Sequence, residues 1–185
     1  MRRALDAIYQ AAMVGACLAM VTIASLVLVQ VVGRMIDRVA VWLGMGRLGI
    51  SIPSLAEIGG FLFVAAAFLA LPATLRAAGH VRVTLALRFF GPLGNRVLAA
   101  LVLIIAALLA GFMTWYAILQ AIDAFDAGRV SYGLIRMPLW VPQSVMALGL
   151  VIFTLAILDE LVAALRGNDP AFRAAERARD IGGSD

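Results

Sequence analysis

Residues 54–87 read SLAEIGGFLFVAAAFLALPATLRAAGHVRVTLAL and contain the clearest membrane-spanning pattern in the chain. The stretch opens with Ser54 and Glu57, at the spacing of a capping box, in which the two side chains cap the first turn of a helix. It then runs without a charge from Ile58 to Leu75 and meets Arg76. A bilayer is crossed by a helix of about 20 mostly apolar residues, so we predict a membrane span here.

Three further stretches have the same character, and the composition agrees with them. Of the 185 residues, 64% are hydrophobic and only 14% are charged, whereas soluble domains are close to half apolar. We predict an all-α integral membrane protein, with a membrane domain over residues 1–167 and a polar cytoplasmic tail over residues 168–185. The four expected spans are residues 8–33, 55–76, 97–122 and 137–159. The first is too long for the roughly 7–15-residue core of a cleavable signal peptide.

The distribution of arginine predicts the orientation in the membrane. All 15 basic residues are arginines, and ten of them fall in the N-terminus, the second connection and the tail. The other five fall in the first and third connections. The positive-inside rule therefore places both termini in the cytoplasm. The net charge of +4 belongs to helix ends that face lipid head groups, so we expect membrane lipids and no nucleic acid as partners.

Two connections have the composition of short amphipathic helices that lie in the membrane interface. In the first, residues 36–43 have apolar side chains at helical spacing beside Trp42, which favours the interface. An ordinary loop is the alternative. In the second, residues 81–90 alternate in polarity, but a lone strand beside a bilayer would leave its backbone unpaired. We therefore expect a helix with Arg82 and Arg88 toward head groups.

Glu57 is the first candidate for chemistry, because an acid within a membrane span is costly and usually functional. Its place one turn after Ser54 favours helix capping or pairing with another helix, and a role in transport is the alternative. The chain has one histidine, His80, and one cysteine, Cys17. A haem with two histidine ligands and the common metal frameworks are therefore excluded within one chain.

Other candidate residues cluster around the third connection. Asp123 and Asp126 lie one turn apart at the end of the third span, and with Arg129 they are candidates for docking a periplasmic partner. A solvated helix end is the alternative. Pro138 lies in the first turn of the fourth expected span, where prolines are tolerated because first-turn N–H groups lack helical partners, and Trp140 would anchor the interface. No charge lies at the middle of any span, and no set of catalytic residues is present. We expect no cofactor and no enzymatic activity, and a chain that supports another protein.

The residues also resemble a known family, the small permease subunits of tripartite ATP-independent periplasmic (TRAP) transporters. Four features carry the resemblance over roughly residues 8–166. They are Arg34 after the first span, Glu57 at the start of the second, His80-Val81-Arg82-Val83 after it, and the run from Ser131 to Trp140, with Gly149 following. Thr84 stands where the family often has an aspartate.

The resemblance implies a multi-subunit transporter in the bacterial inner membrane. Such a small subunit has four spans and scaffolds a large multi-span permease subunit, which carries the substrate and coupling-ion sites. A periplasmic substrate-binding protein delivers an organic acid, whose uptake is driven by an ion gradient. Candidate subunit-interface or structural residues on this basis are Arg34, Glu57, Arg76, His80, Arg82, Pro138 and Trp140.

Two other functions remain open at the level of sequence. One is a self-sufficient homodimeric transporter that uses Glu57. The other is the membrane anchor of a redox complex, for which one histidine and one cysteine are a poor ligand supply.

Overall fold

The computed structural model describes residues 2–46, 49, 52–77 and 92–166. Within these ranges the regular elements are helices, with one isolated bridge between Val130 and Pro138. The four helices are α1 (Arg2–Trp42), α2 (Leu55–Arg76), α4 (Pro92–Asp126) and α5 (Trp140–Leu165). Each helix contains a stretch long and apolar enough to cross a membrane. The structure thus confirms an all-α, multi-pass membrane protein.

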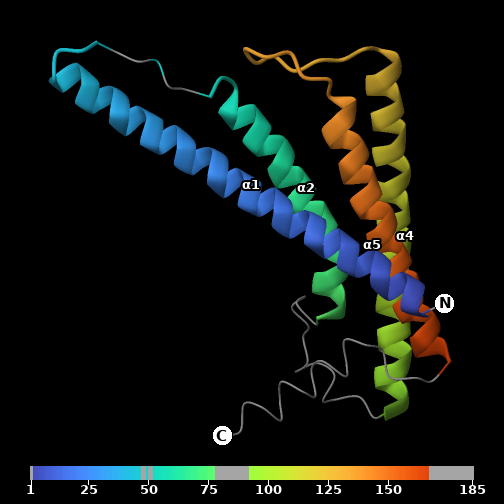
Figure 1. Cartoon of the computed structure of the whole chain (residues 1–185). Coiled ribbons are helices and arrows are strands. Elements are labelled where there is room, and N and C mark those ends of the chain that lie inside the picture. Colours follow the sequence, from blue (N-terminus) through green and yellow to red (C-terminus); the bar gives the residue numbers. More distant parts are fainter. Residues whose placement is uncertain (1, 47–48, 50–51, 78–91, 167–185) are drawn as a thin grey trace, which may run out of the picture.

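The helices follow the spatial order α1, α2, α5, α4 (Figure 1). The inner positions belong to α2 and α5, whereas α1 and α4 form the edges. At its start α2 contacts the connection that leads into α5, and further along Phe68 lies against Gly149. The two central helices therefore run in the same direction, and each edge helix runs opposite to its central neighbour.

The bundle has two ends that we name by their content. The N-terminal end contains the start of α1 and the end of α2, which are joined by an ion pair between Asp6 and Arg76. The loop end contains Trp42, Glu57 and the connection of residues 127–139. This division matches the two sides predicted from the arginines. The assignment of the N-terminal end to the cytoplasm stays a prediction.

Helix α1 is longer than the sequence analysis predicted, and this corrects the first connection. The expected interfacial helix at residues 36–43 is not a separate element, because α1 continues through Gly33 and Arg34 to Trp42. Residues 33–43 contain no proline, so the helix continues past the end of the apolar run at Gly33. At Gly44, with φ +73°, the amides of Gly44 and Met45 bond back to carbonyls of the last turn, a common helix ending.

The length of α1 also bears on its orientation. Its 41 residues, at about 1.5 Å each, make a helix about 60 Å long. The hydrocarbon core of a bilayer is about 30 Å thick. A helix of this length must tilt or extend beyond the core. Figure 1 shows α1 strongly inclined to α4 and α5.

Each edge helix turns one stripe of residues toward its neighbours. On both helices, successive residues of the stripe are three or four positions apart, in alternation. Most members are small, which permits close helix packing in a membrane. The α1 stripe contains Leu5, Tyr9, Ala12, Ala16, Ala19, Ile23, Leu26, Gln30, Gly33, Asp37 and Ala40. The α4 stripe contains Leu103, Ala107, Ala110, Thr114, Ala117, Ala121 and Ala124. The large exposed apolar side chains of both helices lie off these stripes, where lipid or a partner would cover them.

The tightest packing is between the two central helices. A Cβ atom built on Gly149 would lie 2.8 Å from the backbone of Phe68, so only glycine fits there. Pro72 is buried inside α2 and lacks the N–H that would bond the carbonyl of Phe68. The carbonyl freed by the proline therefore lies where α2 and α5 approach most closely.

Two predictions lie outside the described residues. These are the interfacial helix at residues 81–90 and the polar tail at residues 168–185. The division of the chain into membrane domain and tail therefore stays a prediction. Helix α2 has the bounds of the second expected span, residues 55–76. Helices α1 and α4 extend beyond their expected ranges at both ends, whereas α5 begins and ends later than residues 137–159.

Candidate functional site

The most connected polar cluster lies at the loop end, between the start of α2 and the connection of residues 127–139. The Oγ atom of Ser54 accepts a hydrogen bond from the amide of Ile135 at 3.0 Å. The Oε1 atom of Glu57 accepts one from the amide of Gly133, also at 3.0 Å. Two side chains from one turn of α2 thus hold the backbone of a connection about 80 residues away. We call these four residues the α2 clamp.

The capping box predicted from Ser54 and Glu57 is wrong, because Ser54 makes no side-chain capping bond. A capping serine takes an extended backbone, whereas Ser54 is left-handed, with φ 55° and ψ 26°. Its carbonyl still accepts the amides of Glu57 and Ile58, both at 3.0 Å. The other prediction paired Glu57 with another helix, whereas its partner in the structure is the amide of Gly133, in the connection of residues 127–139.

Glycine at position 133 is required by the clamp. A Cβ atom at this position would overlap the carboxylate of Glu57. The second carboxylate oxygen, Oε2, is buried and has no hydrogen-bond partner in the described part of the chain. Glu57 therefore binds the connection through one oxygen and retains capacity for a further donor.

The clamped connection is itself held by short-range hydrogen bonds. It begins at Gly128, with φ +58°, where the amides of Gly128 and Arg129 bond back to the last turn of α4. The amide of Ser131 then donates to the carbonyl of Met137 at 2.8 Å, and the Ser131 hydroxyl accepts the Met137 amide at 3.1 Å. Ser131 is only 7% exposed. The connection is thus a fixed element and not a loose link.

The tip of this connection presents apolar side chains outward. Tyr132 is 104% exposed and Leu134 is 90% exposed. The rings of Phe125 and Trp140 lie edge to face, with their centroids 5.6 Å apart. This contact joins the end of α4 to the start of α5. Pro138 lies before α5 and pairs with Val130 in the isolated bridge. Sequence analysis placed Pro138 and Trp140 correctly near the start of the fourth helix, but not their partners.

The three predicted docking residues are not equivalent. Arg129 forms an ion pair with Asp123 at 2.6 Å, which neutralises one of the two acids. Both side chains remain more than half exposed, at 52% and 60%. Asp126 lies on the same exposed end of α4. A docking role for the three residues stays a prediction.

A second polar cluster lies at the N-terminal end. Arg76 donates to Asp6 at 2.5 Å, and its guanidinium carbon lies 5.1 Å from the centre of the Tyr9 ring, a cation–π arrangement. Tyr9 is 3% exposed, and its hydroxyl has no hydrogen-bond partner among the described residues. Sequence analysis selected Arg76 but missed Asp6 and Tyr9, which are about 70 residues away along the chain.

Glu160 was not among the predicted site residues. The structure buries it at 2% exposed, five residues before the end of α5. Adjacent residues of a helix point to different faces, and here Glu160 takes the inner one. The adjacency of Asp159 and Glu160 in the sequence indicates that the two acids face different ways, but it does not indicate which of them is buried.

The remaining predicted residues are far from both clusters or undescribed. Arg34 is exposed on the extension of α1. His80 and Arg82 lie outside the described residues. In the described ranges no group of three His, Cys, Asp or Glu side chains could hold a metal ion.

A polar contact links two helices near the middle of the bundle. Thr114 on α4 and Thr154 on α5 lie with their hydroxyl oxygens 2.9 Å apart. Each hydroxyl also lies within bonding distance of a carbonyl of its own helix. This pair carries no charge, so it can align α4 and α5 but cannot bind an ion by charge.

Comparison with known proteins supplies the family. No curated protein and no solved structure matches the chain. A protein family model does match, over residues 23–167, which include about the second half of α1 and all of α2, α4 and α5. Its description is "Tripartite ATP-independent periplasmic transporters, DctQ component". The chain therefore belongs to the DctQ family, the small permease components of TRAP transporters.

Proposed function

We propose that this chain scaffolds the large, multi-span transport subunit of a TRAP transporter. The complex would take up an organic acid, delivered by a periplasmic binding protein and driven by an ion gradient. The protein would lie in the bacterial inner membrane with both termini in the cytoplasm. The family match supports partner subunits, because it describes one component of a tripartite transporter. The organic-acid substrate is what the resemblance to such subunits implies.

One observation supports a scaffold more than a transporter. Each helix has an uncharged stretch of at least 18 residues, and the polar clusters lie near the ends of the bundle. Charged substrates and coupling ions cross a membrane along polar or charged side chains. The neutral pair of Thr114 and Thr154 offers no such route. A partner subunit that carries the route would account for this distribution.

Glu57 has a different role in this proposal than in a self-sufficient transporter. Its carboxylate lies in the first turn of α2 and bonds to the amide of Gly133. In this position it orders the connection of residues 127–139, which would face the periplasm. The clamp would thus present a fixed surface to the binding protein or to the large subunit.

Affinity purification of this chain from its native membrane, followed by mass spectrometry, tests the proposal. We expect a large membrane protein with many spans to be recovered in stoichiometric amount. The matched control is a purification from the same strain without the affinity tag. Recovery of the chain only as itself, alone or as a dimer, would contradict the scaffold function.

A further inference from the structure

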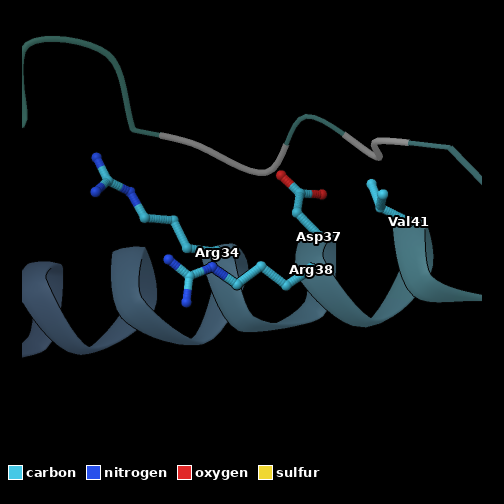
Figure 2. A pocket seen from close by; sticks show the side chains of 4 residues that line it. All are labelled: Arg34, Asp37, Arg38 and Val41. Atoms are coloured by element: carbon cyan, nitrogen blue, oxygen red, sulfur yellow. The ribbon is translucent and has the colours of Figure 1, made fainter.

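The last two turns of α1 line a hollow of about 340 Å³ that no function described so far uses (Figure 2). Its lining residues are Arg34, Asp37, Arg38 and Val41. They are spaced as neighbours on one face of a helix. Both arginines are exposed, whereas Asp37 is partly buried. The hollow therefore presents two guanidinium groups from adjacent turns.

The charge of this hollow is positive. Among the described residues, neither Arg34 nor Arg38 forms an ion pair; the recorded pairs are Asp6–Arg76 and Asp123–Arg129. The two guanidinium groups are therefore available to a ligand, whereas Asp37 already interacts with another group. The planar donor fork of arginine matches the oxygens of a phosphate group, which it can bind through two hydrogen bonds. The hollow thus suits an anionic ligand group with phosphate oxygens.

The direction of the arginine side chains connects the hollow to the membrane span. Figure 2 shows both guanidinium groups on the side of the hollow that leads back along α1. Long side chains in helices point toward the N-terminus, and here that direction is the uncharged part of α1. Val31 and Val27 continue the same face, three and seven residues before Arg34, and are 48% and 47% exposed. A cationic hollow therefore opens onto an exposed apolar track.

We propose that this hollow binds the phosphodiester headgroup of an anionic phospholipid, with one acyl chain along Val27 and Val31. A free phosphate ion shares the headgroup chemistry, but it makes no use of the apolar track. A phospholipid offers both the anionic phosphodiester for the two arginines and an acyl chain for the track. The inference does not depend on the transport function, because it concerns the surface of α1 alone.

Lipid binding to the purified full-length chain in detergent tests this assignment. Dioleoylphosphatidylglycerol is titrated and the bound fraction is measured by native mass spectrometry, with dioleoylglycerol and inorganic phosphate as parallel probes. The test variant is R34Q/R38Q. The matched control is R129Q/R136Q, which removes the same charge from the other connection at the loop end. Circular dichroism establishes that each variant retains its helices.

We expect R34Q/R38Q to weaken phosphatidylglycerol binding at least fivefold and the control to change it less than twofold. Dioleoylglycerol should not saturate the protein. Equal binding by R34Q/R38Q and the native chain would overturn the proposal, as would equal binding of dioleoylglycerol. Saturation by inorganic phosphate at similar concentrations would assign the hollow to a free ion instead.

Should the glutamine variant fail to fold, R34K/R38K takes its place, because lysine keeps the charge but lacks the planar fork. A loss of at least threefold relative to the control supports the site. Unchanged affinity contradicts it.

Discussion

The contact between Glu57 and Gly133 shows at the scale of one residue what a sequence can and cannot predict. Ser54 and Glu57 stand out because of their spacing at the start of an apolar helix. The same spacing led to the wrong bonding pattern, because a capping box is local and the real partners are remote. Nothing near Glu57 indicates Gly133, which lies 76 residues away. Only the packing of α2 against the approach to α5 brings them together.

Substituting Gly133 by alanine should destabilise the purified chain. The added Cβ would overlap the Glu57 carboxylate and displace it from the amide that it accepts. Loss of a hydrogen bond to a charged group costs about 1.5–3 kcal/mol. We expect a lower midpoint of thermal unfolding in detergent. Gly60→Ala is the control, since a Cβ atom on Gly60 meets nothing within 4 Å. Equal midpoints for the native chain and G133A would contradict the clamp.

The ion pair between Asp6 and Arg76 should contribute only modestly to stability. Its side chains are 47% and 32% exposed, and exposed pairs contribute about 0.2–1 kcal/mol. A double-mutant cycle with D6N and R76Q measures the coupling free energy. The more exposed pair of Asp123 and Arg129 serves as the comparison and should show a smaller coupling. A larger coupling for Asp123 and Arg129 would contradict this ranking.

At the scale of elements, the sequence predicted the number and class of the helices because uncharged runs are long and unambiguous. It failed at the end of α1, where apolar character stops at Gly33 but helical geometry continues to Trp42. Hydropathy reports what the bilayer covers, whereas helix ends depend on local breakers such as Gly44. The spatial order of the helices was also beyond prediction, because alanine is frequent on every helix and few positions select a neighbour.

A distance measurement along α1 tests its continuity. Spin labels are placed at Ala11 and Val41, both exposed, in a chain whose exposed Cys17 is replaced by alanine. Thirty residues of unbroken helix correspond to about 45 Å. We expect a single distance near this value from pulsed electron resonance. A clearly shorter distance would show that α1 breaks after Gly33 and turns into the interface.

Packing between α2 and α5 should depend on Gly149. In G149A the new methyl group would meet the backbone of Phe68 at 2.8 Å, and backbone cannot move aside as a flexible side chain does. Overpacking of this kind typically costs about 1–3 kcal/mol. We expect thermal unfolding of G149A at a lower temperature than that of G111A, because Gly111 on α4 has nothing within 4 Å of its added Cβ. The reverse order would contradict the close approach of α2 and α5.

At the scale of the whole molecule, the arrangement agrees with a supporting subunit. Two central helices are fixed to one another, and two edge helices turn small residues inward and large apolar residues outward. The polar clusters lie near the ends of the bundle, and toward the middle of the described helices the neutral pair of Thr114 and Thr154 links α4 to α5. The sequence already indicated that no charge lies at the middle of a span. The packing of the helices, which brings the hydroxyls of Thr114 and Thr154 within hydrogen-bonding distance, could not be predicted from the sequence.

The central claim is that this chain supports transport without carrying the substrate route. Uptake of radiolabelled succinate, pyruvate and sialic acid is measured in proteoliposomes, with a sodium gradient and the binding protein supplied. The native chain and the E57Q variant are each tested alone and together with the co-purified large subunit. We predict no uptake by the chain alone, uptake with the large subunit, and substantial uptake with E57Q, whose amide oxygen can still accept the Gly133 amide. Uptake by the chain alone that is abolished in E57Q would contradict the account and assign transport to Glu57.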